Sequence, residues 1–564
     1  MVNTASIKRF RINILYLFMP VLLTSALDAQ DYDISKSSAA AADTVQGKYF
    51  SKKLYATRLL PMYEKTKALL PSPIMDEKPG YIEMYWKAWE LGFRNFQEPQ
   101  QGSGFISQFI DAAFNQNIFL WDSCFMTMFC NMASPLVPGI CTLDNFYAKQ
   151  YPDGEICREI NRTTGKNYEP WNNRKGSQLY SEWGYNEAGK VPIVYIGRNE
   201  PQSPPVLTLD ALDHPLFAWA EMESFRVTGD TARLNLVYEP LARYYGALRE
   251  YLRQGNGLYM TDWASMDNSP RNRFLKGGGC GVDISCEMVL FAEQIAKIAR
   301  IIGKSGDAAK FEKDAKDLSA TINHLMWDPE RKFYYDLTVD GKRTKIKTVA
   351  AFWTLLAGVA SKERAKALAA ELENSTTFGR MHRVPTLAAD EPGYDPKGGY
   401  WRGAVWAPTT FMVIRGLEKY GLRDLARKIA MENIDMMWRV FKETGTVWEN
   451  YAPDSISPGI PARSDFVGWS GICPILCLLE YGIGLNPDAP KNELRWDIRA
   501  GKQIGCKRFR FNNHVVDLFA SPAGVKNWNI LIHSDSDFNL KAKAGGKEYP
   551  FAVKKGDNHF SIDR

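Results

Sequence analysis

The chain has 564 residues, which is enough for one large core or for more than one domain. Hydrophobic residues make up 45% and charged residues 24% of it, the ordinary balance of a globular protein. The formal net charge of +6 is small for this length, and Lys and Arg are too dispersed for a nucleic-acid-binding surface, so no nucleic-acid partner is expected.

The segment 1–29 has the pattern of an export signal. Basic residues between positions 8 and 11 precede an apolar run at 12–23, and small residues place a cleavage site after Ala29 or Ala26. The apolar run is short for a membrane-spanning helix, so we expect cleavage and no membrane span afterwards. No Cys stands at the cleavage site, which argues against a lipoprotein. The segment therefore predicts a bacterial-type exported protein, periplasmic or secreted.

Residues 30–75 are predicted to form an N-terminal leader and lead-in segment, and 76–486 a helical region. Apolar residues at helical spacing predict helices at 215–226, 240–254, 284–302, 307–326, 348–360, 362–372, 405–420, 423–441 and 468–481. Successive helices form antiparallel pairs of about 40 to 60 residues, a repeat typical of stacked or toroidal helical arrays. We expect a ring of helix hairpins whose long Gly-, Trp- and Asp-rich loops gather at one end.

The pattern changes near Pro487. Residues 487–564 contain short alternating segments such as FRFNNHVVDLF and WNILIHS, with Asn, Gly and Asp at the turns. They predict a small C-terminal β module of roughly six strands or fewer. We interpret this module as a packing element that carries no chemistry.

The cysteine pattern gives little support to a metal site. The chain has nine cysteines, and no pair of CxxC units appears among them, so a zinc site is not expected. Several lie in apolar contexts, which favours buried thiols. An exported protein could also form one or two disulfides.

The first candidate cluster is a polar loop between two predicted helices, TDWASMDNSPR. Asp267 lies near Trp263 and Met266, and desolvation by such neighbours raises a carboxyl pKa, as a general acid for a sugar leaving group requires. Asn268 and Arg271 follow as candidate substrate-binding residues. The alternative is that Asp267 only caps a turn.

The second cluster is GTVWENYAPDS, directly after a predicted helix. Glu449 stands between Trp448 and Asn450, both of them candidate substrate-binding residues. Placing a carboxylate among aromatic rings costs free energy unless it has partners, which favours a functional role. The alternative is a buried structural ion pair with Arg402 or Arg463.

The third cluster is GGYWRGAVWAPTT. Tyr400, Trp401 and Trp406 offer aromatic faces, and Arg402 offers a fork of hydrogen-bond donors. The aromatic residues could simply line a core. The glycines at the start of the cluster favour a tight backbone and a pocket wall instead.

Two further clusters contribute candidate substrate-binding residues. Trp121 and Asp122 open a predicted helix in NIFLWDSCFMTMF, although Asp122 could be only an N-terminal cap. Arg158 and Glu159 lie in the polar segment QYPDGEICREINR.

The combination of clusters is more specific than any one of them. Two carboxylates on separate loops, each beside a Trp, match what glycoside hydrolysis requires. A Ser–His–Asp triad does not compete, because none of the six His has a suitable setting. Two alternatives stay open. A polysaccharide lyase could use Arg402 to neutralise a uronate carboxylate and Tyr400 or Tyr451 to move the proton. A carbohydrate-binding protein without catalysis is the other.

The order of six motifs, LWDSCF, DGEICRE, WASMDNSPR, GGYWRGAVWAPT, VWENYAPD and FVGWSG, resembles glycoside hydrolase family 63 and, more distantly, the trehalases. The resemblance implies a mainly α fold, an (α/α)6 toroid of the six-hairpin glycosidase type, and inversion at an α-linked sugar. It implies that Asp267 is the general acid and Glu449 the general base. The first sugar subsite is implied for Trp121, Asp122, Trp401, Arg402 and Trp406. Family members usually carry an N-terminal β domain, for which this chain has too little sequence.

The expected reaction is hydrolysis of an oligosaccharide or polysaccharide from its chain ends. Inversion predicts carboxyl groups of the acid and base roughly 6.5–9.5 Å apart. Arg402 and Arg158 are expected to hold hydroxyls or a carboxylate of the sugar, and Trp401, Trp406 and Trp263 to stack on it. No cofactor is expected, and although some relatives bind calcium, no calcium-loop motif is present. The sugar and the oligomeric state are not predicted.

Overall fold

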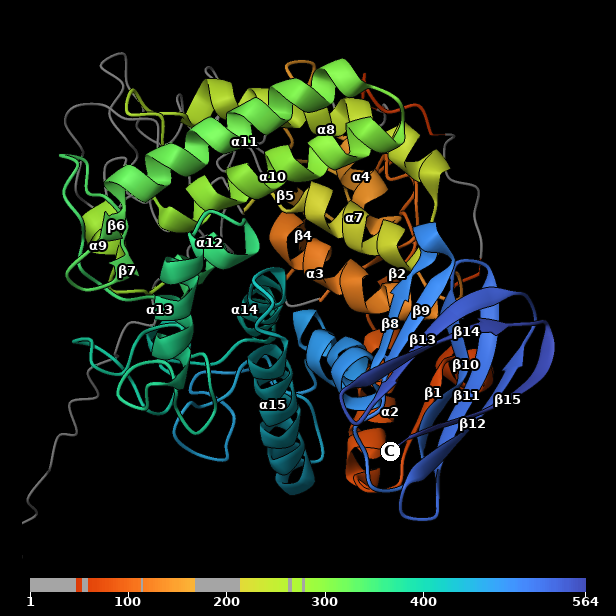
Figure 1. Ribbon diagram of the computed structural model, residues 1–564. Coiled ribbons are helices and arrows are strands. Elements are labelled where there is room, and N and C mark those ends of the chain that lie inside the picture. The colour runs from red at the N-terminus through yellow and green to blue at the C-terminus, as the bar shows by residue number, and fades with distance from the viewer. Residues whose placement is uncertain are drawn as a thin grey trace, which may run out of the picture. The chain divides into compact units, whose positions relative to one another are not determined.

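The computed structural model describes residues 47–52, 59–112, 115–167, 214–261, 266–275 and 279–563 (Figure 1). The predicted export signal and Trp263 lie outside these residues. Within the described ranges, no helix combines the length and the apolar character needed to cross a membrane.

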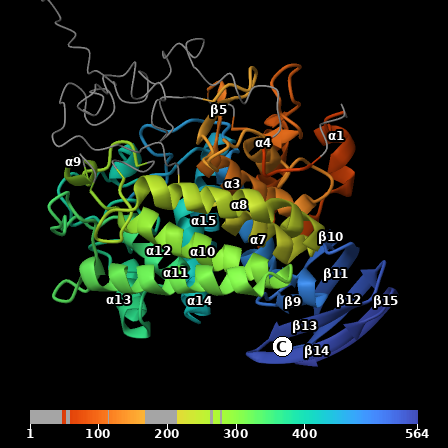
Figure 2. The ribbon, with the colours of Figure 1, turned by 90° about the horizontal axis from the view of Figure 1, so that it is seen from above.

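Helices dominate the described chain up to Ile483. The α-helices are α1 (Tyr63–Thr66), α2 (Pro79–Phe93), α3 (Leu120–Cys130), α4 (Thr142–Ala148), α7 (Phe217–Thr228), α8 (Thr231–Leu252), α9 (Asn272–Leu275), α10 (Val282–Ile301), α11 (Ser305–Leu325), α12 (Trp353–Leu356), α13 (Lys362–Glu373), α14 (Ala407–Lys419) and α15 (Arg423–Thr444). A 3-10 turn at Trp469–Ile472 continues into a π-helix at Cys473–Ile483. Figures 1 and 2 show α8, α10 and α11 side by side, and α14 packs against α15.

Short reversals at the helix ends explain why consecutive helices form hairpins. α7 ends at Gly229, whose φ of 67° is a left-handed conformation that glycine adopts without strain. The side chain of Asp230 then accepts a hydrogen bond of 2.9 Å from the backbone N–H of Arg233 and caps α8. Gly421, with a φ of 76°, reverses the chain between α14 and α15 in the same way.

Three of the predicted helices differ from the observed ones. The helix predicted at 468–481 is the 3-10 turn and π-helix described above. α8 begins at Thr231 rather than at residue 240, because Asp230 caps it there and Pro240 is accommodated inside the helix. The predicted helix at 348–360 is instead a 3-10 turn at Val349–Phe352 that continues into the short α12. Helix α2 was not among the predictions, although it starts with a proline at its first position, where the missing N–H has no intrahelical partner in any case.

Strands follow the helices and form two main sheets. The five-stranded sheet has the order β1 (Ser72–Met75), β10 (Ile504–Phe511), β11 (His514–Ala523), β12 (Asn527–Ser534) and β15 (Gly556–Asp563). The four-stranded sheet has the order β14 (Lys547–Val553), β13 (Phe538–Ala544), β9 (Glu493–Asp497) and β8 (Leu485–Asp488). Three two-stranded ribbons pair β2 (Phe96–Gln97) with β3 (Phe109–Ile110), β4 (Asn117–Phe119) with β5 (Glu159–Asn161), and β6 (Trp327–Asp328) with β7 (Phe333–Tyr334).

The β module is larger than predicted, since its two sheets have five and four strands. One of these strands, β1, comes from the beginning of the described chain and runs antiparallel to β10, with Ser72 opposite Lys507 and Met75 opposite Ile504. The segment SPIM is short and contains a proline, so its sequence alone does not read as a strand. It becomes one because β10 supplies the hydrogen-bonding partner.

The module packs directly against the helices. Trp496 of β9 has no exposed surface, and its indole N–H donates a hydrogen bond of 3.0 Å to the backbone oxygen of Ile483, the last residue of the π-helix. The backbone N–H of Asn512 donates to the oxygen of Val227 in α7 at 2.7 Å. Helix ends that would otherwise need solvent are therefore satisfied by the β module.

The helical core is built around aromatic rings. Trp219 of α7 stacks on Phe411 of α14 with ring centres 5.9 Å apart, and it also contacts Phe125 of α3 at 5.7 Å and Trp353 of α12 at 6.1 Å. One side chain thus joins four helices. The nine cysteines are thiols, and eight of them are buried. This core supports the loops that carry the candidate site.

Candidate active site

The turn that carries the third predicted cluster depends on its glycines. Gly399 and Gly403 have φ values of 51° and 151°, and a Cβ atom there would lie 2.7 Å from the Cβ of Asp395 and 2.6 Å from its backbone oxygen, respectively. Tyr400 has a φ of 63°, a left-handed conformation that is rare for an aromatic residue. Strain of this kind persists where the surroundings enforce it, often at functional sites.

The tryptophans predicted from separate motifs come together beside this turn. Trp401 and Trp406 stack with ring centres 4.5 Å apart and planes 7° from parallel. Trp121 of α3 approaches Trp401 at 6.4 Å, and Trp469 approaches both Trp406, at 5.7 Å, and Trp121, at 6.0 Å. All four are buried. Trp469 was not predicted as a site residue, although it lies in the FVGWSG motif.

Glu449 is buried and held from two sides. Its Oε2 accepts a hydrogen bond of 3.1 Å from the backbone N–H of Arg463, and its Oε1 accepts one of 3.4 Å from the hydroxyl of Tyr400. Burial raises the pKa of the carboxyl, while Arg463 and the Tyr400 hydrogen bond oppose the rise. The indole of Trp469 and the hydroxyl of Ser470 each donate to the Glu449 backbone oxygen at 3.2 Å. The carboxyl group is therefore fixed in position and has a raised pKa.

Tyr400 links the two predicted catalytic loops. Burial raises the pKa of its hydroxyl well above the ordinary value, and the negative charges of Glu449 and then Asp267 raise it further. Asp122 acts in the same direction, whereas the positive charge of Arg463 opposes them. Carboxylates from three separate motifs thus raise the pKa of the Tyr400 hydroxyl.

The loop of Asp267 is tied to the Tyr400 turn by Asn268. The Asn268 amide donates a hydrogen bond of 3.0 Å to the oxygen of Gly399, and its oxygen accepts one of 2.9 Å from the N–H of Trp401. The side chain of Asn272 closes the loop by donating to the backbone oxygen of Met266 at 2.8 Å. Asn268 is therefore engaged with the backbone and positions the loop. Asp267 itself is partly exposed.

The Trp121 and Arg158 motifs are brought together by the β4–β5 ribbon. Phe119 pairs with Glu159, and the N–H of Leu120 donates to the oxygen of Arg158 at 2.8 Å. Glu159 is buried and accepts a hydrogen bond of 2.6 Å from the side chain of Asn117. Its contact with a substrate stays a prediction, as does that of Arg158. Asp122 lies in the first turn of α3 and is buried.

Arg271 occupies a place different from the one expected of a substrate-binding residue. It has no exposed surface and forms ion pairs with Asp283 of α10 at 2.5 Å and with Asp336 at 3.1 Å. Burial raises the pKa of Asp336 to about 6 despite the nearby guanidinium. The structure therefore does not support substrate contact by Arg271. The sequence alone could not show that Asp283 and Asp336 pair with Arg271, or that these ion pairs fix the end of the Asp267 loop.

Asn450 and Trp448 also form hydrogen bonds within the protein. Asn450 has no exposed surface and donates a hydrogen bond of 3.1 Å to the oxygen of Pro461, so substrate contact is not supported for it either. The indole N–H of Trp448 donates to the hydroxyl of Thr444 at 3.0 Å, back toward the end of α15. Arg402 is exposed and donates through Nε to the oxygen of Gly393 at 2.9 Å.

A buried histidine and glutamate lie next to the aromatic wall and were not predicted. Nδ1 of His214 lies 2.5 Å from Oε2 of Glu287 on α10, and both residues are buried. The imidazole stacks on Trp353 at 6.3 Å and contacts Trp121 at 6.2 Å. Burial raises the pKa of Glu287 to about 7, while His214 opposes the rise. A Glu within the apolar stretch ISCEMVLFA of α10 was the signal that could have revealed this pair.

No metal-binding cluster of three or more His, Cys, Asp or Glu side chains is found among the described residues. The expectation that no cofactor is needed stays a prediction. The described site is instead built from two carboxyl loops, a phenol and an aromatic wall.

Comparison with known proteins bears on this arrangement. The model of the family described as "Mannosylglycerate hydrolase MGH1-like glycoside hydrolase domain" matches residues 186–470, half of the chain. The chain belongs to this family. The matched range includes both Asp267 and Glu449.

Individual relatives agree with the family match. An uncharacterized protein of Borreliella burgdorferi is 27% identical over 366 residues, which cover 62% of this chain and 75% of the relative. A mannosylglycerate hydrolase of Rubrobacter radiotolerans is 30% identical over 190 residues, 33% of this chain and 40% of the relative.

A solved structure supports the fold. The GH63 mannosylglycerate hydrolase of Thermus thermophilus in complex with glucose covers 70% of this chain and 99% of its own, with a TM-score of 0.51 and 19% identity. The predicted (α/α)6 toroid with a C-terminal β module is confirmed, as is the resemblance to family 63. This MGH1-like enzyme is a glycoside hydrolase, and its substrate is a carbohydrate.

Proposed function

We propose that this MGH1-like enzyme hydrolyses an α-linked glycoside with inversion, using Asp267 as general acid and Glu449 as general base. Asp267 gives its proton to the glycosidic oxygen as the bond to the anomeric carbon breaks. Glu449 takes a proton from a water molecule that attacks the same carbon from the opposite face. Proton exchange with solvent then restores both groups for the next turnover.

The observation that carries this proposal is the contact of both carboxyl loops with Tyr400. The Tyr400 hydroxyl donates to Glu449 at 3.4 Å, and the charges of Glu449 and Asp267 both raise its pKa. Asn268, next to Asp267, also bonds the backbone of Gly399 and Trp401 on either side of Tyr400, so both carboxyl loops meet at one turn. We propose a separation of roughly 6.5–9.5 Å between the carboxyl groups, because an inverting enzyme must hold a water molecule between the base and the sugar.

The surroundings of Glu449 suit a general base. A raised pKa strengthens it as a proton acceptor, and a base is most useful when its pKa approaches the working pH. The hydrogen bonds from Arg463 and Tyr400 hold the carboxyl in one orientation, which reduces the entropy lost when the attacking water binds.

The names of the relatives suggest which substrate to test first. Mannosylglycerate joins a sugar to a small carboxylate, and relatives of this chain are named as its hydrolases. We propose that a small glycoside of this kind, or a sugar at a chain end, binds against Trp121, Trp401 and Trp406, with Arg158 near its acidic group. We also propose that the enzyme is exported, on the strength of the segment 1–29.

The test is to follow hydrolysis of α-mannosylglycerate and a panel of α-linked oligosaccharides by proton NMR of the anomeric signal. The wild type should release the β-anomer first, because inversion at an α-linked sugar gives that product. Asp267→Asn and Glu449→Gln should each lower kcat by at least about 100-fold, the usual contribution of a general acid or base.

Matched controls come from the exposed face of α11. Glu312→Gln and Asp317→Asn make the same chemical changes on partly exposed residues outside the site and should leave kcat unchanged. Near-normal turnover in Asp267→Asn would show that Asp267 is not the general acid, and near-normal turnover in Glu449→Gln would show that Glu449 is not the general base. First release of the α-anomer would refute inversion.

Membership in a glycoside hydrolase family favours hydrolysis over the lyase and binding-protein alternatives. The same reaction mixtures distinguish them. A lyase would produce an unsaturated product that absorbs in the ultraviolet, without consuming water. A binding protein would retain the sugar and release no product.

A further inference from the structure

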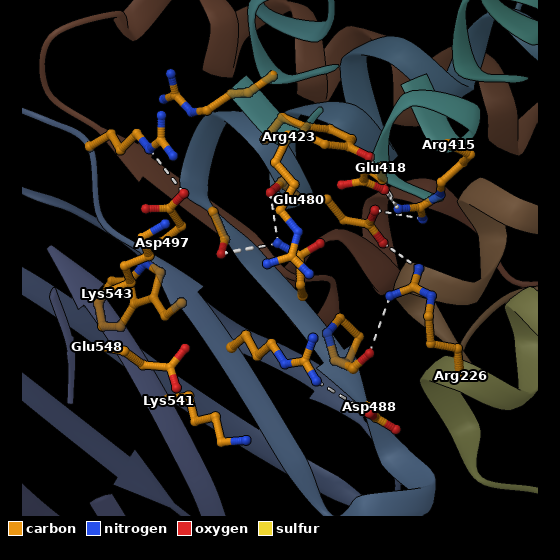
Figure 3. Close-up of a pocket in the computed structure, with 18 residues that line it drawn as sticks. Arg226, Arg415, Glu418, Arg423, Glu480, Asp488, Asp497, Lys541, Lys543 and Glu548 are labelled. Carbon is orange, nitrogen blue, oxygen red and sulfur yellow. Dashed lines mark hydrogen bonds and ion pairs between the residues drawn. The ribbon is translucent and has the colours of Figure 1, made fainter. Parts of the chain in front are cut away.

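A second cavity lies between the helices and the four-stranded sheet, separate from the Asp267 and Glu449 loops. Its volume is about 350 Å³, and its walls come from α7, α14, α15, the π-helix and strands β8, β9, β13 and β14. Figure 3 shows Lys541, Lys543 and Glu548 on the strands and Arg226 and Arg415 on helices. We refer to it as the interdomain cavity.

Positive charge predominates in this cavity. Eight cationic side chains line it against five acidic ones. The cationic residues are Arg226, Arg415, Arg423, Arg427, Arg495, Arg499, Lys541 and Lys543, and the acidic ones are Glu418, Glu480, Asp488, Asp497 and Glu548. Three acids just outside the lining, Glu223, Glu493 and Asp424, form ion pairs with some of these cations, so the positive excess is confined to the cations without such a partner. A local excess of this kind attracts anions.

One end of the interdomain cavity is neutralised by its own acids. Arg226 forms ion pairs with Glu480 and Glu223, and Arg415 pairs with the same two glutamates at 2.7 and 3.1 Å. Arg415 also contacts Glu418 at 3.1 Å. These arginines hold the π-helix against α7 and α14, and they have little capacity left for a ligand.

The opposite end contains cations without an ion pair. The side chains of Arg423, Arg427 and Lys543 make no ion pair or hydrogen bond with another residue of the described ranges. The nearby Arg499 pairs with both Asp497 and Asp424 at 2.9 Å. Burial and the positive charge of Arg499 lower the pKa of Arg427, while the charges of Asp497 and Asp424 oppose the shift from a distance.

The placement of Arg423 and Arg427 is unfavourable without a ligand. The two arginines are four residues apart on α15, where like charges face each other and destabilise a helix. On β13, Lys541 pairs with Glu493 at 2.7 Å, and Lys543 lies opposite Glu548 of β14. α15 begins at Arg423 without a side-chain cap, so its first N–H groups and the helix dipole add positive potential.

We propose that the interdomain cavity binds a small, multiply charged oxyanion carrying phosphate or carboxylate groups. The guanidinium groups of Arg423 and Arg427 supply paired donors that match such oxygens, and Lys543 supplies a third cation from the sheet. A sugar chain fits less well, because most of the lining residues are charged and only two, Trp496 and Tyr481, are aromatic. An anion there joins α15 to β13 and so fastens the sheet to the helices.

Isothermal titration calorimetry at low ionic strength tests this site, with inorganic phosphate, citrate and a trimer of galacturonic acid as the probes. The wild type should bind phosphate or citrate with one-to-one stoichiometry. Arg427→Gln should weaken this binding by about tenfold or more, as expected for loss of one charge-assisted contact, and Arg423→Gln combined with Arg427→Gln should abolish it. Without anion, the variants should melt no lower than the wild type, because repulsion is relieved.

Two controls separate this site from other anion binding. Arg439→Gln removes the same charge from an exposed position of α15 outside the cavity and should leave the affinity unchanged. Asp267→Asn should also leave it unchanged, since the active site is elsewhere. The proposal is overturned if no small anion binds, if Arg427→Gln binds as the wild type does, if Arg439→Gln loses equal affinity, or if the galacturonate trimer alone binds.

Discussion

Glu449 is the residue at which burial and chemistry are most closely coupled. Its carboxyl is almost fully enclosed, and within the described ranges a backbone N–H and a phenol donate to it. Burial therefore raises its pKa, and the same environment that strengthens it as a base makes its charged form unfavourable in the folded protein.

A stability measurement reveals this coupling. Because the pKa of Glu449 is higher in the folded than in the unfolded chain, its contribution to stability is complete below about pH 4.3 and is lost as the pH rises through the folded value. At pH 7, Glu449→Gln should therefore raise the melting temperature by roughly 1–3 °C. The difference should shrink as the pH is lowered to 4, because the Glu449 carboxyl then becomes increasingly protonated.

Calorimetric melting of both proteins at pH 4 and pH 7 checks this expectation, with the exposed Glu312→Gln as the control that should show no such gain. A lower melting temperature of Glu449→Gln at pH 7 would mean that its hydrogen bonds outweigh the burial of charge.

Single residues were predictable when their motif carried the information. The tryptophans Trp121, Trp401 and Trp406 do assemble beside the Glu449 loop. Arg271 and Asn450 look equally functional in sequence, yet both are buried against protein partners. Exposure and the identity of distant partners are tertiary properties, so a motif alone cannot distinguish a residue that binds substrate from one that holds the loop.

At the scale of elements, the turn around Tyr400 is the most constrained segment of the site. It passes so close to Asp395 that two of its positions exclude any Cβ atom. The turn directs Tyr400 toward Glu449. The backbone N–H of Trp401 donates a hydrogen bond to the side chain of Asn268, which belongs to the other carboxyl loop. Its backbone shape therefore determines how the two loops meet.

Gly403→Ala tests this dependence. A Cβ at Gly403 would lie 2.6 Å from the oxygen of Asp395, and its φ of 151° is unfavourable for alanine, so we expect a loss of about 1–3 kcal/mol in the free energy of unfolding. Turnover should fall as well, because the turn must shift.

Gly246→Ala is the matched control. Gly246 lies inside α8, and a Cβ atom there would have no neighbour within 4 Å, so alanine should stabilise the protein by about 0.5–1 kcal/mol. Urea denaturation gives both values. Equal stability and activity of Gly403→Ala and the wild type would show that the turn is not constrained.

Elements were predicted well where local signals mark both ends. The predicted helices at 362–372 and 423–441 match α13 and α15 to within a few residues, and clear apolar periodicity runs through both. The start of α8 was placed too late, since Pro240 is a typical first-turn residue and the weaker signal of Asp230 was not used. Strand β1 could not be predicted, because its partner lies at the other end of the chain.

At the scale of the whole described molecule, the β module belongs to the structural unit of the helices. β1 completes its larger sheet from the N-terminal side, and Trp496 reaches the end of the π-helix. The helices and the sheets accordingly form one compact unit. Residue patterns identified the two regions correctly as helical and β-rich, but they carried no information on how closely the regions are joined.

Trp496→Ala tests whether the regions unfold together. Removing a fully buried indole should lower the free energy of unfolding by about 3–5 kcal/mol. Far-ultraviolet circular dichroism reports mainly the helices. It should show this loss of stability in the same unfolding transition that tryptophan fluorescence reports.

Leu531→Ala provides the comparison. Leu531 is 44% exposed on β12, so this substitution should lower the free energy of unfolding by less than about 1 kcal/mol. If Trp496→Ala left the helical transition unchanged while the β module melted separately, the two regions would be independent.

The pairing of β1 with β10 also has a consequence during biosynthesis. The strand β1 leaves the ribosome ahead of helices α2 to α15, but its partner β10, at 504–511, follows all of them. The larger sheet therefore cannot close until every one of these helices has been synthesised. For a chain that we propose to be exported, we expect β1 to stay unpaired, and so able to enter a translocation channel, throughout that interval.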